Sequence, residues 1–157
     1  MSLRFIGEYR SDRTPKSRWR RRTPSERIHI RMNFRNLAKE CASLALAKKA
    51  KEILILDVRK LTPITDYFVI CSGGSNIHVE TIAEWIVSGI GRKGISPLNI
   101  EGQKPARWIL IDYVGVIAHV FYEPIRKFYG LEKLWAEGRK IKFPEGKIEK
   151  SRKPNRG

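Results

Sequence analysis

The chain has 157 residues, which suffices for one globular domain with short extensions and is too short for several domains. Its 32 Lys and Arg residues outnumber its 16 Asp and Glu residues, so the formal net charge is +16. This charge favours an anionic partner such as nucleic acid, whereas a 41% hydrophobic content excludes a chain that is disordered throughout. Cys41 and Cys71 lie far apart without a Cys-x-x-Cys motif, which excludes zinc fingers and disulfide frameworks, so we expect both to be buried.

Most of the excess charge lies near the two ends of the chain. Residues 1–31 hold 10 basic and 3 acidic side chains, and residues 136–157 hold 8 and 3, whereas residues 32–135 hold 14 and 10. No stretch of apolar residues is long enough for a membrane span, and the N-terminus lacks the apolar run of a secretory signal. We therefore expect a soluble, cytoplasmic protein that makes no membrane contact.

Residues 1–31 have the composition of a basic, disordered extension, with an Arg-Trp-Arg-Arg-Arg run at 18–22. Three interpretations are open. The extension is an RNA-contacting arm, an organellar transit peptide that would change the expected location, or upstream sequence included by a start codon chosen too early. Met32 directly precedes the first helical pattern, which suits the third interpretation. We expect a folded domain over 32–136 and a basic C-terminal tail over 137–157.

Apolar residues at helical spacing predict an amphipathic helix over 34–50, with Asn33 as its N-cap. The apolar run 53–58 is too short and too β-branched for a buried helix, so it predicts a central strand. A second buried strand covers 67–71. A Ser-Gly-Gly-Ser turn then leads directly into a helix whose apolar residues recur over 79–90.

The second half of the chain predicts three further strands and a helix. A short strand over 98–101 is followed by apolar runs at 108–113 and 116–122, and the two residues between those runs predict a tight hairpin. This hairpin brings Trp108 near Phe121 and Asp112 near Ala118. Pro124 suits the first turn of a last helix over 125–136.

The resulting order αββαβββα predicts a single α/β domain with a mixed β-sheet and flanking helices. The turn at Gly73-Gly74-Ser75 could bind phosphate, because the first amides of a helix attract anions, but it lacks the residues of a P-loop or of a dinucleotide fingerprint. Nucleotidyltransferase-like folds share a Gly-Ser turn and use carboxylates two positions apart on a strand. Asp57 and Asp112 each lack such a second carboxylate. We therefore expect no catalytic residues, no metal and no cofactor.

His119 interrupts an apolar strand, so it either exposes one face to solvent or a partner, or is buried with a hydrogen bond. Aromatic residues crowd the last three elements more densely than a small core requires, which is typical of a protein interface. We expect about half of these residues to fill the core, with Phe121 and Phe128 foremost. The aromatic residues are Trp108, Tyr113, Phe121, Tyr122, Phe128, Tyr129 and Trp135.

A series of motifs runs in order over about 34–135. They are Leu56-Asp57-Val58-Arg59, Thr65-Asp66-Tyr67-Phe68-Val69-Ile70-Cys71-Ser72-Gly73, Glu101-Gly102, Trp108-Ile109-Leu110-Ile111-Asp112-Tyr113, His119-Val120-Phe121 and Phe128-Tyr129-x-Leu131-Glu132-x-Leu134-Trp135. In this order the motifs resemble the successive signatures of the Iojap/RsfS family of ribosomal silencing factors. Neither end of the chain is part of the resemblance.

The resemblance implies a non-enzymatic factor that binds the large ribosomal subunit through large-subunit ribosomal protein fourteen, near rRNA. Such a factor blocks joining of the small subunit and so represses translation. The resemblance also implies a fold related to nucleotidyltransferases without their catalytic carboxylates, and a homodimer. The residues that match the family's binding face are Trp108, Asp112, His119, Tyr129, Glu132 and Trp135, and Asp66 and Glu101 add acidic contacts to a basic ribosomal protein.

Three positions depart from the family pattern. The hairpin has Val114-Gly115 where the family usually has Gly-Asp, and Ala106 takes a position often held by Gly. Two other functions remain as alternatives to ribosomal silencing. One is a basic RNA-binding domain that acts in ribosome assembly, and the other is a nucleotidyltransferase-like enzyme that uses the Gly-Gly-Ser turn.

Overall fold

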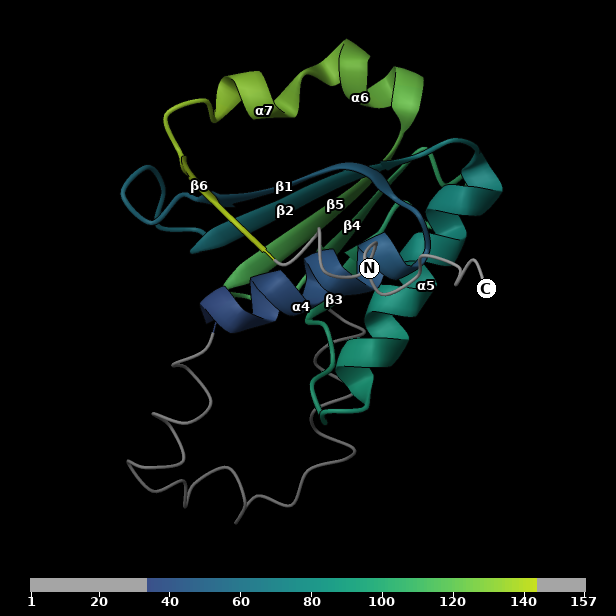
Figure 1. The fold of residues 1–157 in the computed structure, drawn as a ribbon, viewed down its shortest axis with the longest axis horizontal. Coiled ribbons are helices and arrows are strands. Elements are labelled where there is room, and N and C mark those ends of the chain that lie inside the picture. The colour runs from purple at the N-terminus through teal and green to yellow at the C-terminus, as the bar shows by residue number, and fades with distance from the viewer. Residues whose placement is uncertain (1–33, 144–157) are drawn as a thin grey trace, which may run out of the picture.

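The computed structural model describes residues 34–143, so the hypotheses about 1–31 lie outside the described residues. The described part of the chain contains helices on both sides of a sheet (Figure 1). The elements are α4 (Phe34–Ala47), β1 (Lys51–Asp57), β2 (Tyr67–Gly73), α5 (Asn76–Gly91), β3 (Asn99–Glu101), β4 (Trp108–Asp112), β5 (Val116–Tyr122), α6 (Glu123–Tyr129), α7 (Leu131–Leu134) and β6 (Arg139–Ile141). Within 34–143 no helix is long and apolar enough to cross a membrane.

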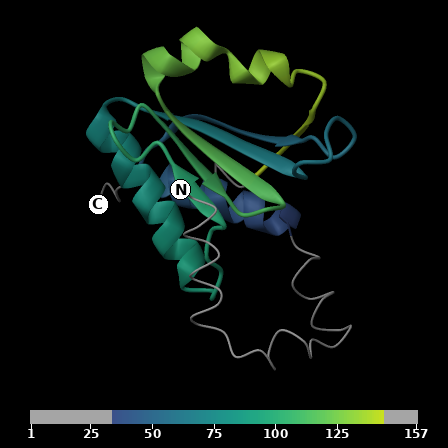
Figure 2. The same ribbon diagram turned by 180° about the vertical axis from the view of Figure 1, so that it is seen from behind.

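The six strands form one mixed sheet in the order β3-β4-β5-β2-β1-β6. Only the β2–β5 pair is parallel among the described pairs, and the others are antiparallel. Helices α4 and α5 cover one face of the sheet, and α6 and α7 lie over the other (Figure 1). The same layers are seen from behind in Figure 2. This confirms the predicted α/β domain with a mixed sheet and flanking helices.

Each face of the sheet has its own core. Cys41 and Cys71 belong to the core beneath α4 and α5, where burial raises the pKa of both thiols, so they are buried as expected. The second core lies beneath α6 and α7. Its buried side chains are Leu56, Val58, Phe68, Ile70, Ile117 and Phe121. Strand β2 is buried along its whole length between the two cores, which explains its uninterrupted apolar run.

The C-terminal part of the fold differs from the prediction in two ways. The expected helix over 125–136 is two helices, because Gly130 adopts φ = 57° between α6 and α7 and ends α6 as a left-handed cap. In addition, the segment expected to be a tail contributes β6, which pairs with β1 and buries Ile141. The folded part of the chain therefore extends beyond residue 136.

The β4–β5 hairpin confirms the expected pairing of Trp108 with Phe121, whereas Asp112 pairs with Ile117 and not with Ala118. The register is set by the closing hydrogen bond of the turn, in which the Tyr113 amide donates to the Val116 carbonyl at 2.7 Å. The side chain of Asp112 turns toward the loop, where its Oδ1 accepts from the Val114 amide at 2.7 Å.

Two of the three departures from the family pattern fall at backbone positions that favour glycine. Val114 has φ = 76° and Ala106 has φ = 64°. A side chain at such an angle crowds its own backbone, and a β-branched one does so most.

We expect Val114→Gly to stabilise the domain by about 1 kcal/mol and to raise the Tm by about 4 °C, measured by thermal unfolding. Because Val114 is exposed, no core contact is lost, and a lower Tm would contradict this account of the turn.

Candidate functional site

A group of rings lies where the second core meets the surface, between β4, β5 and α6. Trp108 is half-buried, stacks on Phe121 with a centroid separation of 4.8 Å, and lies 4.9 Å from the ring of Tyr129. Farther along the sheet, Trp135 meets Phe68 edge to face at 5.2 Å. We call Trp108, Phe121, Tyr129, Phe68 and Trp135, together with His119, the aromatic cluster.

His119 is the polar centre of this cluster. Its Nδ1 accepts a hydrogen bond from Nε1 of Trp108 at 3.1 Å, and its ring meets Phe68 edge to face at 5.1 Å. Because Nδ1 is an acceptor, the ring proton resides on Nε2, which is buried and has no partner among the described residues. His119 is only 5% exposed, so of the two interpretations the structure supports the buried one with a hydrogen bond.

The helices add apolar side chains that face solvent. Tyr129 is 55% exposed and Phe128 is 79% exposed, and their rings meet edge to face at 5.1 Å. Leu134 on α7 is also exposed. The expectation that Phe128 fills the core was wrong, because α6 buries Arg126 and packs Ile125 against the second core, which leaves Phe128 facing solvent. Phe121 is fully buried, as expected.

Glu132 has a structural partner that the sequence analysis missed. Its Oε2 accepts from Nε of Arg126 at 3.1 Å. Arg126 is 5% exposed, and its Nη1 donates to the Ser72 hydroxyl at 2.8 Å and to the Glu52 carbonyl at 2.7 Å. A serine inside a fully buried strand was the available signal, because a buried hydroxyl requires a hydrogen-bond partner.

The remaining acidic candidates lie away from the aromatic cluster. Asp112 is four residues from Trp108 along β4, which corresponds to about 13 Å. Asp66 lies next to the same hairpin turn, where its backbone amide donates to the Gly115 carbonyl at 3.1 Å. Glu101 is exposed on the edge strand β3 and accepts from the side chain of Asn99 at 2.6 Å. The structure therefore brings Trp108, His119, Tyr129 and Trp135 together, with Glu132 close by through Arg126, and separates the other three.

The Gly-Gly-Ser turn is closed by its own hydrogen bonds. The Gly74 amide donates to Nδ1 of His78 at 2.9 Å, and the His78 amide donates to the Ser75 hydroxyl at 3.1 Å. Amides that are already bonded in this way are not available to a phosphate. Within 34–143 no group of three or more His, Cys, Asp or Glu side chains is arranged to hold a metal ion. The geometry thus gives the nucleotidyltransferase alternative no support.

The burial of His119 predicts a pH-dependent stability. Burial among aromatic rings lowers the pKa of His119 from 6.5 to about 4. The folded protein therefore binds this proton more weakly than the unfolded chain, so stability is full above pH 6.5 and is lost as the pH falls toward 4. We expect a loss of roughly 3 kcal/mol from this residue between pH 7 and pH 4.

Urea unfolding at several pH values tests this expectation. His119→Gln keeps an acceptor for Trp108 but does not titrate, so its free energy of unfolding should fall less steeply below pH 6.5 than that of the unmodified protein. Equal slopes in the two proteins would show that other groups cause the acid sensitivity.

Comparison with known proteins identifies relatives of this fold and sequence. A family model described as "Ribosomal silencing factor during starvation" matches residues 31–157. The ribosomal silencing factor RsfS of Bacillus subtilis is 39% identical over 106 residues, covering 68% of this chain and 90% of that protein. The chloroplastic protein Iojap of Zea mays is 35% identical over 112 residues, covering 67% of this chain and 49% of that protein.

A crystal structure of a protein from Bacillus halodurans matches the fold with a TM-score of 0.62 and 32% identity, covering 69% of this chain and 99% of that one. The family match continues to residue 157, so the expectation that the C-terminal segment lies outside the resemblance was wrong. The chain therefore belongs to the Iojap/RsfS family of ribosomal silencing factors.

Proposed function

We propose that this protein binds the large ribosomal subunit through ribosomal protein fourteen and, by occupying that surface, blocks joining of the small subunit and represses translation. The observation that carries the proposal is the exposure of Phe128 and Tyr129 beside half-buried Trp108, with Leu134 also exposed on the next helix, α7. Exposed aromatic side chains next to a rigid sheet are typical anchors of protein interfaces. The protein acts in this proposal as a binding factor and not as an enzyme.

The arrangement suits a protein partner better than a nucleic acid. The exposed side chains are anchored from below, because Tyr129 rests against Trp108 and Trp108 rests against Phe121. Little conformational entropy is therefore lost when a partner covers them. Glu132 on α7 is acidic, and its side chain suits the positive charge typical of ribosomal proteins better than it suits rRNA phosphates.

A subunit-joining reaction tests the proposal. Purified large and small subunits are mixed with the full chain, and ribosome formation is followed by light scattering or gradient sedimentation. We expect the unmodified protein to suppress joining and Phe128→Ala/Tyr129→Ala to require at least about tenfold more protein for the same effect.

Ile77→Ala is the matched control, because Ile77 is 75% exposed on α5, in the opposite helical layer. Truncating it removes a similar exposed apolar side chain and should leave suppression unchanged. Normal joining in the presence of saturating unmodified protein would refute the proposed function. Equal losses of suppression in Phe128→Ala/Tyr129→Ala and in Ile77→Ala would refute the assignment of the exposed aromatic side chains to the binding surface.

A further inference from the structure

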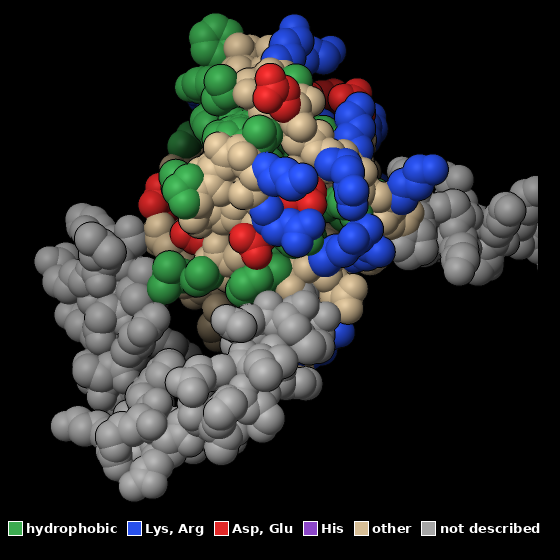
Figure 3. Space-filling model, turned by 90° about the vertical axis from the view of Figure 1, so that its left-hand side faces the viewer, with side chains coloured by type: hydrophobic (Ala, Val, Ile, Leu, Met, Phe, Trp, Pro, Cys, Tyr) green, Lys and Arg blue, Asp and Glu red, His purple; other side chains and the backbone are tan. Residues whose placement is uncertain are grey.

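A group of cations lies at the end of the sheet where β1 finishes, and the proposed function does not use it. Arg59 and Lys60 follow β1 in the chain, and Arg139 on β6 pairs with Asp57, so the loop and the edge strand lie side by side. We call Arg59, Lys60 and Arg139 the basic end. Figure 3 looks onto this end of the molecule and shows Lys and Arg side chains gathered there.

The basic end borders a hollow of about 460 Å³. Its lining residues are Asp57, Arg59, Lys60, Leu61, Glu137 and Arg139. None of them is aromatic, so the hollow offers no platform on which a nucleic acid base could stack. Lys140 and Lys142 are exposed next to Arg139 and extend the positive charge along the edge of the sheet.

One of the two carboxylates in the hollow is already occupied. Asp57 accepts from Nε of Arg59 at 2.9 Å and from Nη2 at 2.7 Å, and it also accepts from the Arg59 amide at 3.1 Å. These hydrogen bonds fix the guanidinium in one orientation, and the side-chain bond from Arg59 is the main cause of the lowered pKa of Asp57. Within 34–143 neither Lys60 nor Arg139 forms an ion pair.

We propose that the basic end binds the phosphodiester backbone of RNA. A line of phosphates can contact the oriented guanidinium of Arg59, the exposed cations of Lys60 and Arg139, and then Lys140 and Lys142. The lack of aromatic residues in the hollow favours contacts with the RNA backbone over recognition of bases. This surface goes beyond the proposed function. The aromatic cluster contacts a protein, and the basic end contacts RNA at a different place on the same molecule.

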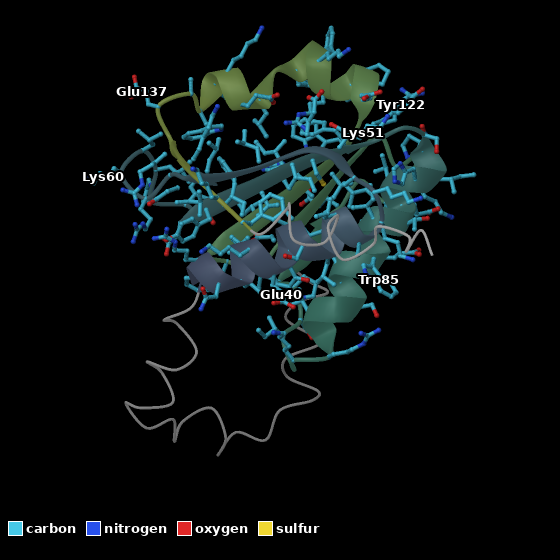
Figure 4. All side chains as sticks on the ribbon, viewed as in Figure 1. Glu40, Lys51, Lys60, Trp85, Tyr122 and Glu137 are labelled. Atoms are coloured by element: carbon cyan, nitrogen blue, oxygen red, sulfur yellow. The ribbon has the colours of Figure 1, made fainter. Side chains whose placement is uncertain are left out.

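The chain offers a matched pair of exposed lysines for comparison. Lys51 begins β1 at the opposite end from Asp57, and Figure 4 shows Lys51 far from Lys60 and Glu137. Lys104 lies in the loop before β4, which starts at that same end of the sheet because β4 pairs antiparallel to β5. Lys51 and Lys104 are both exposed, and within 34–143 neither of them forms an ion pair.

Binding of the full chain to a short fluorescein-labelled RNA duplex is measured by fluorescence anisotropy between roughly 50 and 200 mM salt. Lys60→Gln/Arg139→Gln should bind at least about tenfold more weakly at the higher salt, and its slope of log affinity against log salt should fall by about 2. Lys51→Gln/Lys104→Gln loses the same charge and should bind within about threefold of the unmodified protein, because only the long-range field changes.

Thermal unfolding curves of all variants establish that β6 remains in place. If Arg139→Gln loosens β6, the single variant Lys60→Gln replaces it, because Lys60 is a loop residue. This variant should still lower the slope of log affinity against log salt by about 1. Equal losses in the two double variants would mean that net charge alone attracts RNA, and unchanged binding in both would mean that RNA binds elsewhere; either result overturns the proposal. Because the probe is RNA alone, a negative result would not affect the proposed contact with the ribosomal protein. In the same way, a negative result in the subunit-joining reaction would not affect the proposed RNA contact at the basic end.

Discussion

Replacing Trp108 with alanine is expected to weaken binding to the large ribosomal subunit at least about thirtyfold, equivalent to about 2 kcal/mol. The indole supports Tyr129 at 4.9 Å, so its removal takes away both its own contact area and the support beneath an exposed anchor. The same change should lower the free energy of unfolding by about 3 kcal/mol, because it opens a space against Phe121 and removes the donor to Nδ1 of His119.

Two measurements on each variant separate binding from folding. Affinity is measured well below the melting transition, and stability is measured by urea unfolding. Trp108→Phe keeps a ring against Phe121 and Tyr129 but lacks the Nε1 donor, so it should bind within about threefold of the unmodified protein while losing about 1 to 2 kcal/mol of stability. An unchanged affinity in a folded Trp108→Ala variant would remove Trp108 from the binding face.

Replacing Arg126 with methionine is expected to destabilise the domain by about 3 to 5 kcal/mol. The guanidinium ties α6 to Glu132, to the Ser72 hydroxyl and to the carbonyl of Glu52, and methionine fills its volume without any donor. The Ser72 hydroxyl is buried, so once it loses this donor it cannot regain a hydrogen bond to water. The α6–α7 layer should therefore loosen, and ribosome binding should weaken together with stability.

Neighbouring changes isolate the role of this guanidinium. Lys127→Met alters an exposed cation on the same helix and should change stability by less than about 0.5 kcal/mol. Arg126→Met/Glu132→Gln should be less destabilised than Arg126→Met, because no unpaired carboxylate remains. Full stability of Arg126→Met in urea unfolding would contradict a structural role for the buried guanidinium.

The strands and the hairpin could be predicted from the sequence because their side chains follow simple patterns. Strand β2 is a continuous apolar run buried on both faces, and the short connection at Val114-Gly115 fixes the pairing of Trp108 with Phe121. The resemblance to the family had already grouped Trp108, His119, Tyr129 and Trp135, and in the structure these residues approach one another from β4, β5, α6 and the end of α7.

What the sequence did not reveal depends on contacts between distant segments. Strand β6 is three residues long with a single buried side chain, Ile141, which is too short for any periodic pattern. From the sequence alone, Arg126 resembles an exposed cation on a helix. Its burial becomes evident only from its hydrogen bonds to Ser72 and Glu52, which are far away in sequence. Asp112 was assigned to the binding face, but its carboxylate is used by the hairpin turn.

A photo-crosslinking residue placed at Phe128 tests the account most directly, because this side chain is 79% exposed beside Tyr129 and Trp108. After irradiation with purified large subunits at high salt, mass spectrometry identifies the attached molecule. The account predicts a crosslink to large-subunit ribosomal protein fourteen that is absent when the photo-crosslinking residue replaces Ile77 on α5. Crosslinks to rRNA alone or to another ribosomal protein, or equal crosslinking from both positions, would contradict it.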